Sequence, residues 1–134
     1  MTRLFSVLGT VFCLILAQSC ASDSPNLLLG QWTAFEILEE GEVLDLNPSQ
    51  IQLGFEAGEK YTYLSTLNYR EAGQYRVQAP YLFTIDTTAD QRTEKAVEII
   101  QLTFDSLQLR MNDDGKERIL KLLKTPADSS LIVN

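Results

Sequence analysis

Strict alternation of apolar and polar residues is the feature that most constrains this chain. In the stretch IQLGFE (51–56) every second side chain is apolar, and SLQLRMN (106–112) repeats the pattern. A period of two places alternate side chains on opposite faces of a strand, so each stretch predicts a half-buried strand of an antiparallel sheet. The stretches EKYTYLST (59–66) and PYLFTIDT (80–87) add the aromatic and β-branched residues that strands favour.

Glycine-containing turns are predicted between these strands. The stretches EEGE, EAGE, EAGQ and NDDGK contain Gly41, Gly58, Gly73 and Gly115, and glycine supplies the positive φ that tight hairpins need. The spacing predicts about eight or nine short strands in an all-β domain that is closed as a barrel or a sandwich. The stretch DQRTEKAVEII (90–100) could form a helix, but its β-branched end favours a loop that leads into a strand.

The same alternation predicts which side chains face the interior. Charged substitutions at such positions are expected to unfold the domain, because an unpaired charge is costly to bury. The predicted interior set is Phe35, Ile51, Leu53, Phe55, Ile100, Leu102, Phe104, Leu107 and Leu109.

The first 20 residues have the layout of a secretory signal. Arg3 precedes the apolar run 4–17, which is shorter than the roughly 20 residues of a membrane-spanning helix. The stretch LAQSC (16–20) then resembles a bacterial lipobox, in which a signal peptidase cuts before a cysteine that receives lipid (diacylglycerol and palmitate). Ala17 and Gln18 depart from the usual lipobox pattern.

The lipobox resemblance implies that residues 1–19 are removed and that Cys20 is the lipid attachment site. Cys13 would leave with the signal, so Cys20 would have no partner for a disulfide, and acylation explains a lone cysteine in a secreted domain. The alternative is an ordinary secretory signal in which Cys20 is incidental. Residues 20–26 would form a lipidated tether, 27–124 the barrel and 125–134 a C-terminal tail.

Charge and residue types exclude several functions. Without Arg3 the chain has 10 basic and 18 acidic residues, a net charge of −8, which argues against binding to nucleic acid or to an anionic membrane surface. A domain with this charge would need a covalent anchor to stay at a membrane. The chain has no histidine, which excludes Ser-His-Asp catalysis and a His-ligated metal, and the barrel would contain no cysteine for thiolate chemistry.

Carboxylates are the remaining candidates for chemistry. The stretch EEGEVLD (39–45) contains four of them, and paired carboxylates can hydrolyse a glycosidic bond, but a solvated hairpin is the favoured interpretation. Asp113 and Asp114 resemble part of a calcium loop without its regularly spaced ligands, so a turn is favoured there. The sequence therefore predicts no enzyme activity, no cofactor and no metal site.

Gly30 and Trp32 lie at the start of the first predicted strand. Their pattern resembles the bacterial lipocalin-like domain lipoproteins over residues 27–124. The matching stretches are LLGQW (28–32), FEAGEKY (55–61), GQY (73–75), IIQLTFDSLQLRM (99–111) and DDGKERILKLLK (113–124). The resemblance implies a small antiparallel up-and-down β-barrel in which the Trp packs across the closed end. It also implies a basic residue from the last strand over the indole, with Arg118 as the first candidate and Arg110 as the second.

The lipocalin-like resemblance permits ligand binding without requiring it. An eight-stranded barrel can be filled by its own side chains or can hold one small ligand, and the four Phe and five Tyr beyond the signal could fill it. We expect a monomeric lipoprotein of the bacterial cell envelope, at the outer membrane, that binds a small apolar or amphipathic ligand. The alternative is a solid barrel that acts as a structural or protein-interaction module. A cavity of about 300 Å³ or more, lined by aromatics, would favour the ligand.

Overall fold

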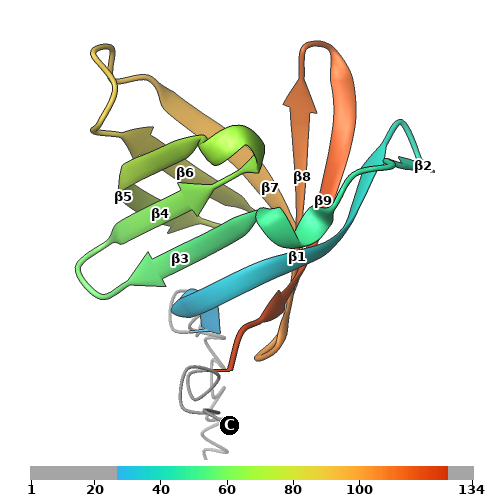
Figure 1. The fold of residues 1–134 in the computed structure, drawn as a ribbon. Coiled ribbons are helices and arrows are strands. Elements are labelled where there is room, and N and C mark those ends of the chain that lie inside the picture. Colours follow the sequence, from blue (N-terminus) through green and yellow to red (C-terminus); the bar gives the residue numbers. More distant parts are fainter. Residues whose placement is uncertain (1–26, 127–134) are drawn as a thin grey trace, which may run out of the picture.

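The computed structural model describes residues 27–126, which form one antiparallel sheet that closes into a barrel (Figure 1). The predicted signal 1–19, Cys20, the rest of the tether 20–26 and the tail beyond Pro126 lie outside the described residues. The strands and short 3-10 helices are β1 (Gly30–Glu39), β2 (Glu42–Val43), η1 (Pro48–Gln50), β3 (Gln52–Glu56), β4 (Lys60–Leu64), η2 (Thr66–Asn68), β5 (Arg70–Gln78), β6 (Tyr81–Asp86), β7 (Glu94–Leu102), β8 (Ser106–Asp113) and β9 (Lys116–Lys124).

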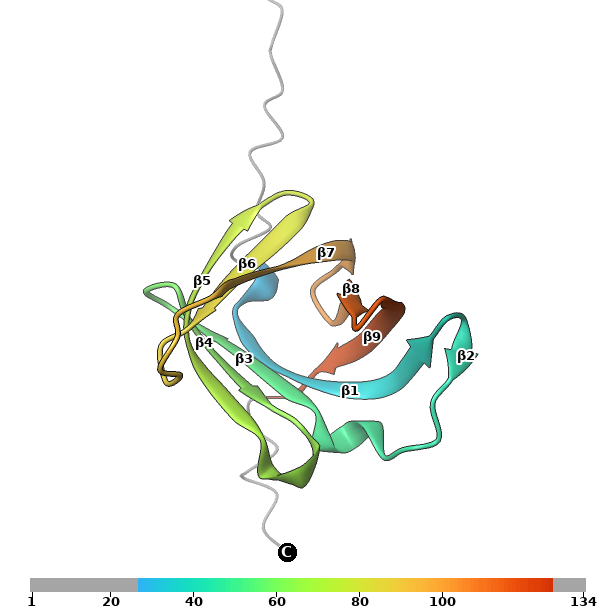
Figure 2. The ribbon, with the colours of Figure 1, turned by 90° about the horizontal axis from the view of Figure 1, so that it is seen from above.

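The strands follow one another around the barrel in up-and-down order. Each strand from β3 to β9 pairs with the next, β1 pairs with β3, and antiparallel pairing of β1 with β9 closes the ring. The short strand β2 folds back on the end of β1 as a hairpin. Seen from above, the ribbon forms a ring (Figure 2). The predicted small all-β barrel is therefore confirmed, with eight strands in the ring and β2 beside it.

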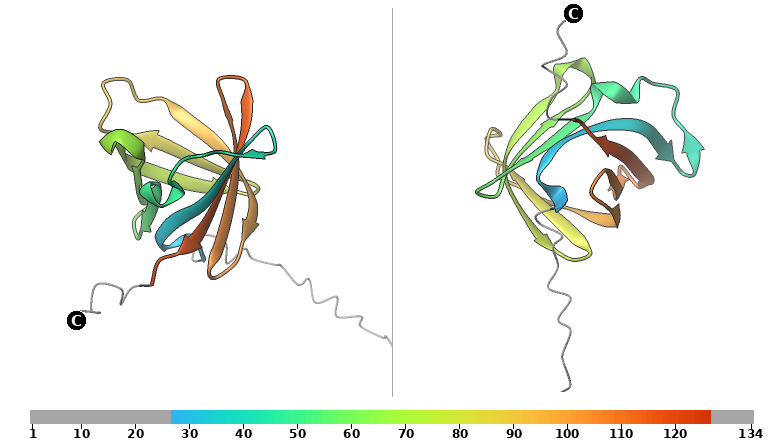
Figure 3. Two further views of the ribbon diagram at one scale, coloured as in Figure 1. Left: turned by 45° about the vertical axis from the view of Figure 1, so that its right-hand side comes forward. Right: turned by 90° about the horizontal axis from the view of Figure 1, so that it is seen from below.

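The two ends of the barrel differ. The chain enters β1 at the end that we call the closed end, where Leu27 and Leu28 are helical. The view from below in Figure 3 shows this blue segment within the outline of the ring. The turns after β3, β5 and β7 lie at the same end, whereas the connections after β1, β4, β6 and β8 lie at the other, the open end (Figure 1). No helix within residues 27–126 is long and apolar enough to cross a bilayer.

Two hairpins have the backbone geometry that their sequences predict. Glu40 and Gly41 have φ values of 50° and 81°, and Asp114 and Gly115 have 54° and 79°. Positive φ at both central residues is the geometry of two-residue hairpin turns that match the twist of the strands. Gly58, with φ of 83°, lies in the turn between β3 and β4. The turns predicted at these three glycines are confirmed, and the stretch 90–100 is a loop that leads into β7, as predicted.

The turn predicted at Gly73 is wrong, because this residue lies inside β5. It pairs with Tyr61 of β4 on one side and with Asp86 of β6 on the other. A Cβ on Gly73 would lie 1.9 Å from the carbonyl oxygen of Ile85. The close approach of two strands therefore requires glycine at this position. From the sequence alone, a glycine of this kind cannot be distinguished from a glycine in a turn.

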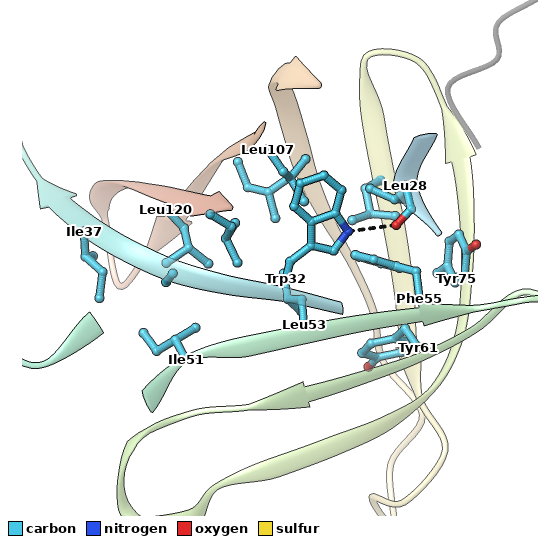
Figure 4. Close-up of a cluster of buried hydrophobic side chains, with 14 residues drawn as sticks. Leu28, Trp32, Ile37, Ile51, Leu53, Phe55, Tyr61, Tyr75, Leu107 and Leu120 are labelled. Carbon is cyan, nitrogen blue, oxygen red and sulfur yellow. Dashed lines mark hydrogen bonds between the residues drawn. The ribbon is translucent and has the colours of Figure 1, made fainter. Parts of the chain in front are cut away.

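Apolar side chains from all around the ring form the core (Figure 4). Its members are Leu28, Trp32, Ala34, Ile37, Ile51, Leu53, Phe55, Tyr61, Tyr75, Leu82, Leu107, Leu109, Leu120 and Leu122. Five residues of the predicted interior set belong to it, and Leu102 packs against it. The closing strands and these core residues all lie within 27–126, so we expect this part of the chain to fold without the segments on either side.

Three residues of the predicted interior set are placed differently. Phe35 is 49% exposed and Phe104 is 73% exposed, while Ile100 is half-buried at a bulge. The register shifts at residues 34–36 of β1 and 99–101 of β7, and the extra residue of a bulge moves the alternation by one position. Phe104 lies in the turn after β7, where no alternation applies.

Candidate functional site

Trp32 lies inside the barrel towards the closed end and has no exposed surface. Its indole Nε1 donates a hydrogen bond of 2.8 Å to the carbonyl oxygen of Leu28, which is also fully buried (Figure 4). The indole therefore packs against the helical turn that precedes β1 and satisfies its only donor there.

The predicted contact of Arg118 with Trp32 is wrong, and Lys124 takes that position. The Lys124 ammonium lies 5.0 Å from the centre of the indole ring. Arg118 instead donates to Glu39 at 2.8 Å and pairs with Asp113 at 2.7 Å, at the open end. Arg110, the second candidate, pairs with Glu98 at 3.7 Å.

The closure of the barrel explains this correction. In an antiparallel pair the start of one strand lies beside the end of the other, and here Trp32 is the direct partner of Lys124. Gly30 has a φ of 127°, and a Cβ there would lie 3.2 Å from Cε of Lys124. Gly30 thus leaves room for the Lys124 side chain, whose ammonium also donates to the carbonyl oxygen of Leu27 at 3.3 Å.

A cavity of about 570 Å³ occupies the barrel interior beside the core and lies in the range of small-molecule sites. Phe55, Tyr61, Tyr63 and Tyr69 supply aromatic lining. The remaining lining residues are Leu53, Glu71, Leu82, Thr84, Lys95, Ala96, Val97, Leu109, Met111, Asn112, Asp113 and Leu120. Trp32 is not part of the lining, because it lies nearer the closed end.

The aromatic residues do not fill this interior, since several of them face outwards. Phe35 and Phe104 are exposed, and Tyr81 is 46% exposed. Phe83 lies on the outer surface of β6 under the Arg76 guanidinium, which is 4.0 Å from its ring centre. The sequence left open whether aromatic side chains fill the barrel; in the structure they do not, and a cavity remains.

Glu71 is the buried polar side chain of the cavity, with 6% of its surface exposed. Its Oε1 accepts hydrogen bonds from the Tyr69 hydroxyl at 2.6 Å and the Lys95 ammonium at 2.5 Å. Its Oε2 accepts one from the Tyr61 hydroxyl at 3.2 Å. We call these four residues the Glu71 cluster. A buried carboxylate with three donors and a cationic partner satisfies the rule that buried charge must be paired.

The cluster favours the ionised forms of its charged members. Burial alone would raise the pKa of Glu71, but the hydrogen bonds from Lys95 and Tyr69 outweigh it and lower the pKa. The hydrogen bond to Glu71 raises the pKa of Lys95. Burial, followed by the negative charge of Glu71, raises the pKa of Tyr61, and the hydrogen bond to Glu71 raises that of Tyr69. At neutral pH the cluster therefore holds one carboxylate, one ammonium and two neutral hydroxyls.

The sequence contained a signal for Glu71 that the turn prediction hid. In β5, Glu71, Gly73 and Tyr75 alternate on one face, and Tyr75 is in the core. Once Gly73 is assigned to a strand, the period of two places Glu71 inside the barrel. Tyr61 comes from β4 and Lys95 from β7, and the pairing of the strands brings them to the carboxylate. Tyr69 directly precedes β5 and lies two residues from Glu71 in the chain.

The acidic stretch 39–45 forms the hairpin of β1 and β2. Glu39 pairs with Arg118 and with Lys116 at 3.3 Å, and these partners, Arg118 foremost, lower its pKa. A carboxyl group that stays ionised is unsuited to donate a proton as a general acid at neutral pH. Asp113 and Asp114 lie at the β8–β9 turn, and no group of three or more potential metal ligands occurs within residues 27–126.

Residues 27–126 form a closed eight-stranded antiparallel barrel with an interior cavity, the architecture of small up-and-down barrels. Among solved structures, a lipocalin-like protein from Bacteroides uniformis ATCC 8492 is similar, with a TM-score of 0.54 over 74% of this chain and 99% of that chain. The two share 16% sequence identity, so the likeness establishes the fold. The chain matches no protein-family profile and no curated protein.

Proposed function

We propose that this protein binds one small apolar or amphipathic molecule inside its barrel, without catalysis, cofactor or nucleic acid. The cavity is the observation that carries the proposal. Its volume of about 570 Å³ lies within the roughly 300–1,000 Å³ that is usual for small-molecule sites, and apolar side chains line most of it. A fully packed interior would instead have favoured the role of a structural or protein-interaction module.

The proposal places the protein in the bacterial cell envelope, as a monomer anchored by lipid at Cys20 to the outer membrane. The apolar run 4–17, the cysteine that follows it and the short polar stretch before Leu27 support the anchor. The described chain begins at the closed end, opposite the open end of the barrel. An anchor attached there would leave the open end free to receive a ligand.

Native mass spectrometry of the protein purified from its own host tests the binding function. We expect a small molecule to co-purify and to be lost in Met111→Trp, which places a large side chain in the cavity lining. Arg110→Trp is the matched control, because its neighbouring position is exposed on the outer face of β8. Folded wild-type protein with only its apo mass, and no added apolar ligand bound, would contradict the proposal and favour the protein-interaction alternative.

A further inference from the structure

We propose that the cavity selects an amphipathic ligand whose polar head carries no net charge, and that the Glu71–Lys95 pair sets this selectivity. The inference rests on the proposed binding function and adds the chemistry of the ligand's head. Three observations carry it: the distribution of polar atoms in the cavity, the hydrogen-bonding capacity of the Glu71 cluster, and the charges around it.

The buried polar groups of the cavity are gathered on one side. Strands β8 and β9 contribute the apolar side chains of Leu109, Met111 and Leu120, and the end of β8 adds Asn112 and Asp113. The segment from β4 to β7 contributes the whole Glu71 cluster and Thr84, together with apolar residues such as Leu82 and Val97. A molecule with an apolar body and a polar head matches such a cavity, because its head can reach the cluster while its body covers the leucines and the methionine.

The cluster retains hydrogen-bonding capacity for a ligand. An ammonium group has three N–H donors, and Lys95 gives one to Glu71, which leaves two. A carboxylate can accept about four hydrogen bonds, and Glu71 accepts three. The cluster can therefore donate to and accept from the same head group, as a hydroxyl or an amide requires.

The charges disfavour an ionised head of either sign. Glu71 and Lys95 compensate each other at 2.5 Å, so the pair offers a ligand ion no net charge of opposite sign. A cationic head would be attracted by the carboxylates of the open-end loops, but beside Glu71 it would meet the Lys95 ammonium. An anionic head would pass the open-end loops 40–47, 65–69, 87–93 and 113–116, which carry six carboxylates against two basic side chains, and would then meet Glu71.

The head-group selectivity is tested with a protein that comprises residues 21–134, by displacing the bound neutral dye Nile red. The competitors are decanol, decanoate and decylammonium, which share one alkyl chain and differ in the charge of the head. We expect decanol to displace the dye at about tenfold lower concentration than either ion, a difference of ~1.4 kcal/mol. Equal displacement by decanoate or decylammonium would overturn the inference and leave the binding function intact.

Two variants should reverse the selectivity in opposite directions. Glu71→Gln leaves the Lys95 charge uncompensated, so decanoate should become the best competitor. Lys95→Met leaves the Glu71 carboxylate uncompensated, so decylammonium should become the best competitor. Unchanged rankings in both folded variants would show that the pair does not set selectivity, and the inference would fail.

An ion pair on the outer face provides the matched controls. Lys121 of β9 and Glu36 of β1 lie 3.0 Å apart and are not part of the cavity lining. Glu36→Gln and Lys121→Met make the same charge changes outside the barrel and should keep the wild-type ranking. If neither Nile red nor any competitor binds to folded wild-type protein, the proposed function itself fails, and the inference fails with it.

Discussion

Trp32 and Glu71 face the same interior but serve different needs. Trp32 is buried beside the closed end with its single donor satisfied by Leu28, so its surroundings are those of a packing residue. Glu71 is also buried but lines the cavity as an ion. The first should therefore determine stability, while the second should affect both stability and binding.

Replacing Trp32 should destabilise the fold without changing ligand affinity. Truncation of a buried aromatic to Ala costs ~3–5 kcal/mol, a large share of the ~5–15 kcal/mol that holds a domain together. Trp32→Phe keeps most of the apolar volume and should be milder. Urea unfolding measures the loss, and displacement of Nile red from Trp32→Phe measures affinity.

Fluorescence provides a direct check, since Trp32 is the only tryptophan. Wild-type emission should be at short wavelength, resist aqueous quenchers and change little when ligand is added. Lys124→Met should alter the emission by removing the ammonium beside the ring, whereas Arg118→Met at the other end of β9 should not. A readily quenched Trp32 that responds to ligand would place it in the binding site instead.

The Glu71 cluster should make stability depend on pH in the acid range. Because the pKa of Glu71 is lowered on folding from its usual 4.5, its contribution is fully present above that value and is lost as the pH falls through the folded pKa. Glu71→Gln should therefore cost about 1 kcal/mol at pH 7 and much less at pH 3. Urea unfolding at both pH values measures the difference.

The control for this pH dependence is Glu56→Gln, at an exposed position on β3. A surface substitution of this kind should change the free energy of unfolding by less than ~0.5 kcal/mol at either pH. A Glu71→Gln deficit that stays constant between pH 7 and pH 3 would show that the amide fails for steric reasons and that ionisation of Glu71 does not stabilise the fold.

At the scale of strands, the sequence predicted the elements better than their irregularities. Alternation identified β3 and β8 with the correct inward faces, because these strands are regular over their whole length. It failed in β1 and β7, where a bulge shifts the register. A bulge arises from the pairing of two strands, so it cannot be predicted from the alternation of residues within one strand.

The candidate site shows the same limit. The apolar lining could be predicted from alternation, as Leu53, Phe55 and Leu109 illustrate. The Glu71 cluster could not, because Tyr61 and Lys95 are distant from Glu71 in the chain and meet it only through the pairing of β4 to β7. Gly73 concealed Glu71 further, since a glycine between polar residues also fits a turn.

The strand role of Gly73 leads to a prediction about β5 and β6. Gly73→Ala would place a Cβ against the Ile85 carbonyl and force the strands apart, at ~1–3 kcal/mol. Hydrogen exchange should accelerate at the amide of Thr87, which donates to the Ala72 carbonyl at 2.9 Å. Gly41→Ala is the control: it has open space around it and should lose stability only through backbone strain, without faster exchange at Thr87. Equal exchange in both variants would contradict the close-approach role.

The two ends of the barrel differ in their side chains and in their charge. The closed end holds the start of the described chain, the buried Trp32 and the Lys124 ammonium. The open-end loops carry an excess of carboxylates. A net charge of −7 over the chain gives no electrostatic attraction to an anionic bilayer, which supports the proposed covalent anchor.

The two cysteines allow the anchor to be tested with a matched pair of variants. Cys20→Ala removes the thiol that would carry the lipid, so the protein should appear in the soluble fraction or remain unprocessed with its apolar run 4–17. Cys13→Ala lies within that run and would be removed with the signal, so it should leave processing and membrane retention unchanged. Fractionation of cells followed by intact-mass measurement distinguishes these outcomes, because acylation adds the mass of the fatty chains to a chain that begins at Cys20. Membrane retention of Cys20→Ala at the processed size would refute lipid attachment and favour an ordinary secretory signal, while the barrel's binding function would stand on its own cavity.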